Sequence, residues 1–182
     1  REAPPPRPRQ ARVRLSRGED MAADYLISSL QPLDLDGPAP YTMERFLEMC
    51  RDQIGPDPFR AHAAAWADLD AQLRNAIASE RARAHGLDPA KWRHPVKGCS
   101  LYWANRVSAA FQEKNPAARD RLLDQVYWDA AGELTSPTSP LSAAAALTYA
   151  IRLKIVIRRR ALSTEAGNAV FDRLTAASRI EP

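Results

Sequence analysis

The chain has little of what disulfide-stabilised, zinc-binding and membrane-spanning proteins depend on. Among its 182 residues are only two cysteines, Cys50 and Cys99, which lie far apart and outside any CxxC pair. This excludes a disulfide framework and a cysteine zinc site, and it favours a reducing compartment. No window reaches the roughly 18 uninterrupted apolar residues that a membrane-spanning helix needs. The sequence therefore predicts a soluble protein.

Motifs for catalysis and for cofactor binding are also missing. There is no GxSxG elbow, no Walker loop and no GxGxxG fingerprint. His62, His85 and His94 lack the HxxxH or HExxH spacing that places two imidazoles on one helical face. Asp68 and Asp70 are two positions apart and cannot face each other on a helix. We therefore expect no enzyme activity, no cofactor and no metal site, although a cofactor-independent enzyme without a motif stays an alternative.

The positive charge of the chain is unevenly distributed. The formal net charge is +4, and residues 1–20 contribute +3 of it, with six arginines against three acids, which leaves only +1 for residues 21–182. The same 20 residues contain four prolines and almost no large apolar residue, a composition typical of disorder. We predict a disordered Arg/Pro-rich tail over 1–20 and one helical domain over 21–182. Met21 is a candidate for the true translation start.

From Tyr41 onward, apolar residues recur at the spacing of an α-helix. Four of the expected helix starts place a capping side chain before a proline, which is a favoured first helical residue. With two further caps, the expected starts are at Thr42, Asp57, Asp88, Asn115, Ser139 and Ser163. Breaks are expected near residues 55–57, 86–88, 95–99 and 136–139. The sequence therefore predicts an all-α, single-domain bundle of about six helices.

The longest helix is expected from Pro58 to about His85, and Gly86 would end it in a left-handed conformation. Before the helices, Tyr25–Leu30 is a short apolar run that ends at Gln31-Pro32, and we predict an extended N-terminal segment there, packed over the helices. The predicted core residues are Trp66, Leu69, Leu73, Leu123, Val126, Tyr149, Leu153, Val156, Phe171 and Leu174.

Two basic clusters allow more than one interpretation. The first is Arg152, Lys154, Arg158, Arg159 and Arg160, which end one predicted helix and complement the negative end of its dipole. The second combines side-chain types that stack on bases and bind phosphates: Lys91, Trp92, Arg93, His94 and Lys97. The position of Trp92 one turn after a proline cap favours a core anchor over a base-stacking residue. A basic helical RNA-binding module is therefore an alternative, which the nearly neutral body of the chain disfavours.

Several segments resemble a bacterial family. Residues 25–50, YLISSLQPLDLDGPAPYTMERFLEMC, resemble the opening of a domain-of-unknown-function family whose genes lie in V-type ATPase operons. Leu73-Arg74-Asn75 is similar to the LRN of its long helix. Residues 115–129 are similar to its NP…LLD…WD segment, residues 149–154 to its YALKL helix, and residues 167–171 to its closing segment after that helix. Gln31 and the extension before Met21 depart from the pattern.

The resemblance, which covers residues 24–174, implies a fold and a function. The family is in turn similar to the helical C-type subunit of V-type ATPases, which seats the central rotor stalk on the membrane ring. The resemblance thus implies a non-catalytic, all-α adaptor in proton or sodium transport, with the ATPase stalk and membrane-ring subunits as partners. It implies a cytoplasmic protein without membrane insertion, with peripheral attachment to the inner face of the cell membrane left open. No nucleic acid partner is expected.

The surface that would bind these partners is expected in two places. One is the exposed polar side of the long helix, Gln72, Asn75 and Arg83, where Asn75 has no obvious role within its helix. The other is the basic end Arg158, Arg159 and Arg160, since three successive arginines exceed what compensation of a helix dipole requires. Arginine is also favoured at interface hot spots.

Overall fold

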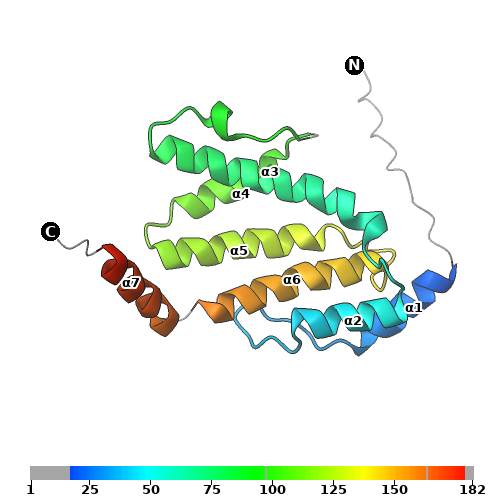
Figure 1. The fold of residues 1–182 in the computed structure, drawn as a ribbon. Coiled ribbons are helices and arrows are strands. Elements are labelled where there is room, and N and C mark those ends of the chain that lie inside the picture. The colour runs from blue at the N-terminus through cyan, green and yellow to red at the C-terminus, as the bar shows by residue number, and fades with distance from the viewer. Residues whose placement is uncertain (1–16, 97, 163, 179–182) are drawn as a thin grey trace, which may run out of the picture.

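The computed structural model describes residues 17–96, 98–162 and 164–178. Within these ranges the chain is all-α and contains no strand, which confirms the predicted fold class (Figure 1). The α-helices are α1 (Arg17–Ser29), α2 (Met43–Gln53), α3 (Arg60–Ala84), α4 (Leu101–Phe111), α5 (Pro116–Gly132), α6 (Ala143–Ala161) and α7 (Thr164–Ser178). A short 3-10 helix, η1, spans Pro89–Trp92. No helix among these residues is long and apolar enough to cross a membrane.

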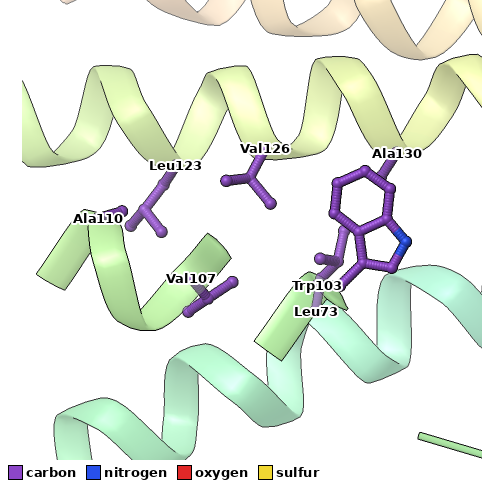
Figure 2. Close-up of a cluster of buried hydrophobic side chains, with 7 residues drawn as sticks. All are labelled: Leu73, Trp103, Val107, Ala110, Leu123, Val126 and Ala130. Atoms are coloured by element: carbon purple, nitrogen blue, oxygen red, sulfur yellow. The ribbon is translucent and has the colours of Figure 1, made fainter. Parts of the chain in front are cut away.

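The helices pack around two apolar clusters. α3 packs against α4 and η1, α4 against α5, α5 against α6, and α6 against α1 and α2 (Figure 1). The first cluster joins α3, α4 and α5, and Figure 2 shows its buried side chains: Leu73, Trp103, Val107, Ala110, Leu123, Val126 and Ala130. The second joins α1, α2 and α6 through Leu26, Phe46, Cys50, Ala146, Ala150 and Leu153.

Three of the predicted caps bond a backbone amide at a helix start. The Thr42 hydroxyl accepts a hydrogen bond from the Arg45 amide at 3.2 Å, and the Asn115 side chain accepts from the amides of Ala117 and Ala118. Asp88 caps η1 rather than an α-helix. Ser163 lies outside the described residues.

Two predicted helix starts are wrong, by two residues for α3 and by three for α6. The Asp57 carbonyl accepts a bond from the Arg60 amide at 3.4 Å, so Asp57 opens a turn, and α3 begins only at Arg60. Ser139 closes a turn, because its amide donates to the Ser136 carbonyl, and α6 begins at Ala143. In both cases the proline lies in the short segment that precedes the helix. The four predicted breaks are present, and Gly86 adopts the left-handed φ of 66° at the end of α3.

The prediction of an extended segment at Tyr25–Leu30 is wrong, because α1 includes Tyr25–Ser29. Ala23 and Leu26 are fully buried, and Ile27 and Leu30 are half-buried, which is the i, i+3, i+4, i+7 spacing of a helical stripe. The first residue of that stripe, Ala23, precedes Tyr25–Leu30, so the helical spacing cannot be recognised from those six residues alone. α1 begins at Arg17, inside the range predicted as a tail, and residues 1–16 lie outside the described residues.

The predicted core is mostly correct, but not in α7. Trp66, Leu69 and Tyr149 are half-buried, while the buried members are Leu73, Leu123, Val126, Leu153 and Val156. Phe171 and Leu174 are 65% and 61% exposed, so this part of the prediction is wrong. The physical reason is that α6 ends at Ala161 and α7 continues away from the bundle, where no described helix covers its apolar residues (Figure 1).

Candidate functional site

Gln72 and Asn75 form hydrogen bonds that hold the loop between η1 and α4 against α3. The Asn75 side chain donates to the His94 carbonyl at 2.9 Å and accepts from the His94 amide at 2.8 Å. Gln72 accepts a hydrogen bond from the Ser100 amide at 3.0 Å. Both side chains belong to half-buried residues. The expectation that they lie on an exposed polar face is therefore wrong. Asn75 holds the backbone at His94, a role that the sequence does not reveal.

A cavity of about 300 Å³ lies between α3 and this loop, and Arg83 is at its edge. The Arg83 side chain is 56% exposed and forms an ion pair with Glu80 one turn earlier, at 2.5 Å. On the other wall, the Arg93 Nε donates to the Ser79 hydroxyl at 3.1 Å. Of the three residues predicted on α3, Arg83 is thus the exposed one, while Gln72 and Asn75 are half-buried.

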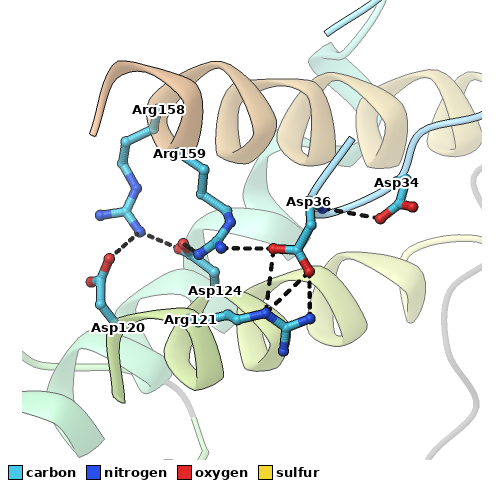
Figure 3. Close-up of polar contacts among 7 residues, drawn as sticks. All are labelled: Asp34, Asp36, Asp120, Arg121, Asp124, Arg158 and Arg159. Atoms are coloured by element: carbon cyan, nitrogen blue, oxygen red, sulfur yellow. Dashed lines mark hydrogen bonds and ion pairs between the residues drawn. The ribbon is translucent and has the colours of Figure 1, made fainter. Parts of the chain in front are cut away.

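Two of the three arginines at the end of α6 bind acidic side chains of the protein itself. We call their surroundings the acid–arginine network, and Figure 3 shows its members: Asp36, Asp120, Arg121, Asp124, Arg158 and Arg159. Arg159 bridges Asp36 at 2.7 Å and Asp124 at 3.2 Å, and Arg158 also pairs with Asp124. The Asp124 side chain is 5% exposed, so this carboxylate is stabilised by two cations rather than by water. Arg160, in contrast, is exposed.

The network attaches the loop between α1 and α2 to the bundle. Asp36 pairs with Arg121 of α5 and Arg159 of α6. Hydrogen bonding from Arg121 is the main cause that lowers the pKa of its carboxyl, and Arg159 adds to this shift while burial opposes it. The loop itself is a tight turn, in which the Asp34 side chain accepts from the Asp36 amide. A side chain at Gly37 would approach the Asp34 Cβ to 2.9 Å, which explains the glycine there.

The two halves of the predicted partner surface do not form one face. Gln72 and Asn75 point to the loop that follows η1. Arg158 lines a groove on the other side of α3, together with Asp70 and Arg74, which form the predicted i,i+4 ion pair at 2.8 Å. A partner that contacts both halves would have to reach around α3.

Three of the segments that resemble the bacterial family contact one another. The Tyr149 hydroxyl donates to the Gln31 carbonyl at 2.9 Å, which joins residues 149–154 to residues 25–50. The Arg152 Nε donates to the Trp128 carbonyl at 3.2 Å, which joins residues 149–154 to residues 115–129. The ion pair of Arg121 with Asp36 joins residues 115–129 to residues 25–50. Three stretches far apart in the sequence thus form one contact region around α5 and α6.

Other candidates from the sequence are dispersed. Among the described residues, no group of three or more His, Cys, Asp or Glu side chains could hold a metal ion. Trp92 is 56% exposed, so its interpretation as a core anchor is wrong. Lys97 of the same basic cluster lies outside the described residues. The sequence does not reveal the pair of Asp36 and Arg121: Asp36 lies in the LDLDG turn, and Arg121 has no local signal.

Comparisons with known proteins give no match for this chain, whether among protein-family models, curated proteins or solved structures. Functional inference therefore relies on the motifs of the sequence and on the contacts described above.

Proposed function

We propose that this chain is a non-catalytic subunit or accessory factor of a bacterial V-type ATPase, a C-like helical adaptor between stalk and ring. The identity of the partner comes from the sequence resemblance over residues 24–174. The all-α fold is the class that this resemblance implies. An adaptor between stalk and ring must transmit force. A close-packed bundle whose loop between α1 and α2 is attached by ion pairs has the rigidity that this requires.

The observation that best supports an adaptor is the exposed apolar side of α7. Val170, Phe171 and Leu174 are 46%, 65% and 61% exposed, and their spacing places them on one side of the helix. Isolated exposed apolar residues are common, but a helix that presents several of them outside the bundle is a typical docking element. We propose that a helical groove in the stalk or the ring of the ATPase covers this side of α7.

Charge at the end of α6 indicates what surrounds that groove. Arg160 is exposed and precedes α7 by only a few residues, and Leu162 between them is 63% exposed. A partner that covers α7 would meet this cation at the edge of the contact, where an acidic residue would complement it. Arg158 and Arg159 contribute differently, because their charges are already matched by Asp124, Asp36 and Asp120.

The test is to purify the full chain with an affinity tag from its native cells in mild detergent. We expect the stalk and ring subunits to co-purify with the wild-type protein. Phe171→Asp combined with Leu174→Asp should remove them, and Arg160→Glu should reduce their yield. The matched control is Leu101→Asp, because Leu101 is an equally exposed leucine, at 74%, on a different helix.

Two outcomes would overturn the proposal. One is a wild-type chain that brings down no ATPase subunit under conditions in which the ATPase itself stays assembled. The other is a chain that elutes with RNA in a salt-dependent manner, which would favour the RNA-binding alternative and its exposed Trp92. If the α7 variants co-purify as well as Leu101→Asp does, the adaptor assignment survives and only the position of the interface is wrong.

A further inference from the structure

Arg152 on α6 is held in a fixed orientation but has no acidic partner. Its Nε donates to the Trp128 carbonyl at 3.2 Å, and its guanidinium lies over the Trp128 ring at 4.9 Å from the centroid. Within the described part of the chain, its two terminal nitrogens have no hydrogen-bond partner and it forms no ion pair. The nearby Asp129 is occupied by Arg106 at 2.7 Å.

This arrangement differs from the neighbouring arginines of the same bundle. Arg121, Arg158 and Arg159 each bind at least one carboxylate. Arg152 is half-buried, and burial lowers its pKa although Asp129 opposes the shift, so its charge is partly desolvated and is paired with no carboxylate among the described residues. A cation in this position gains free energy when an anion enters from outside.

Arg152 lines a cleft of about 370 Å³ between α5, α6 and the segment after α1. The lining is mixed, and Ile27, Leu30 and Pro32 belong to its apolar part. The hydroxyl groups of Thr135 and Thr148 in the same lining bond within the protein, since Thr148 donates to the Ala131 carbonyl and also bonds Thr135 at 3.0 Å. Gly132 leaves the space for the guanidinium, because a Cβ there would lie 2.8 Å from the Arg152 Nη2.

We infer that this cleft is a binding site for a carboxylate carried by an apolar group, with the terminal nitrogens of Arg152 as its anchor and Ile27, Leu30 and Pro32 as its apolar wall. A planar guanidinium binds a carboxylate through two parallel hydrogen bonds, and its stacking on Trp128 fixes the plane in which they form. The site does not depend on the ATPase assignment.

A carboxylate fits this cleft better than a phosphate does. A carboxylate carries one negative charge, which the single guanidinium neutralises. A phosphate monoester carries close to two at neutral pH, and no second cation among the lining residues would pair with the second charge. The carboxylate can come from a Glu or Asp side chain of a protein segment or from a free carboxylic acid, and both present the same group to Arg152.

The direct test follows the Arg Nε–Hε signals of the ¹⁵N-labelled full chain by NMR during titration with 4-methylpentanoate. We expect a saturable shift of the Arg152 signal. The neutral isostere 4-methylpentanamide should bind at least about tenfold more weakly, because it cannot form the charge-assisted bonds. Inorganic phosphate should bind more weakly than 4-methylpentanoate. Equal binding of acid and amide, or tighter binding of phosphate, would overturn the inference.

Two variants separate the site from the stability of the fold. Arg152→Gln removes the anchor and should weaken binding of 4-methylpentanoate by about tenfold or more, which in this variant is followed by the indole N–H signal of Trp128. Gly132→Ala displaces the guanidinium by filling its space, and it should leave the protein folded, because the displaced atom is the end of a flexible side chain and alanine suits a helix. Arg160→Gln, at an exposed arginine of the same helix, is the control. Folded variants at Arg152 and Gly132 that bind like this control would contradict the site.

A further titration identifies the source of the carboxylate. The capped peptide acetyl-Leu-Glu-Leu-amide has no free terminus, so it presents only a Glu side chain flanked by apolar residues. Tighter binding of this peptide than of 4-methylpentanoate would assign the cleft to a protein segment. The reverse order would assign it to a small carboxylic acid. If neither compound shifts the Arg152 signal, the inference is wrong.

Discussion

α5 makes two different kinds of contact, with an apolar cluster on one side and an ion-pair network on the other. On one side, Leu123, Val126 and Ala130 pack against α3 and α4 in a cluster of apolar side chains (Figure 2). On the other side, Arg121 and Asp124 join α6 and the loop between α1 and α2 through the acid–arginine network (Figure 3). Free energy from apolar burial depends little on pH and salt, whereas ion pairs respond to both. The two sides should therefore be distinguishable by experiment.

The largest effects are expected where apolar side chains are fully buried. Leu73 is fully buried among side chains of three helices, so Leu73→Ala should lower the free energy of unfolding by about 2–5 kcal/mol. Chemical denaturation measures this loss. Leu69→Ala is the matched control, because Leu69 is on the same helix but only partly buried, and its loss should be smaller. A loss below about 0.5 kcal/mol for Leu73→Ala would contradict the assigned packing of α3.

An intermediate effect is expected at the centre of the network. Asp124 is almost completely buried and compensates Arg158 and Arg159 together. Asp124→Asn keeps the shape of the side chain but removes its charge, which should cost about 1.5–3 kcal/mol, the usual range for hydrogen bonds to charged groups. Asp120→Asn should cost less than about 0.5 kcal/mol, since its pair with Arg158 is long and exposed to solvent. Equal losses for the two variants would show that burial of Asp124 is unimportant.

These two regions also differ in how far the sequence predicts them. Leu73, Val126 and Leu153 are predicted correctly as core because apolar residues at helical spacing must share one face. The partners of Asp36 are 85 and 123 residues away in the chain, and no local pattern specifies them. Three successive arginines therefore suggest an external partner, although two of them bind acids within the fold.

The loop over α3 shows the same limit on a smaller scale. Asn75 has no visible role when only its own helix is considered. Its partner is the backbone of His94, 19 residues later, and a backbone group leaves no trace in the sequence pattern. Periodicity predicts which side of a helix is polar, but it does not predict whether that side meets water or another segment.

A smaller effect is expected from protonation of Asp36, whose side chain is 45% exposed. Its pKa is lowered from 3.8 in the folded protein, mainly by Arg121, so its contribution to stability is present above the unfolded value and is lost as pH falls through the folded one. Between about pH 5 and pH 3, the wild type should therefore lose more stability than Asp36→Asn.

Denaturation midpoints across this pH range give the measurement. The control is Leu73→Ala, which should lower stability at every pH without changing the slope, because it removes only apolar contacts. If Asp36→Asn and the wild type lose stability in parallel, the ion pairs of Asp36 do not form in solution.

The smallest effect is expected in α7, and it decides whether that helix belongs to the core. Phe171 is 65% exposed and Phe46 is fully buried against Tyr149, with ring centroids 5.0 Å apart. Phe46→Ala should therefore cost about 3–5 kcal/mol, whereas Phe171→Ala should change the free energy of unfolding by less than about 0.5 kcal/mol. A loss of several kcal/mol at Phe171 in the isolated protein would mean that α7 folds back onto the bundle. Its apolar side would then be inaccessible to a partner, and the observation that best supports an adaptor would be lost.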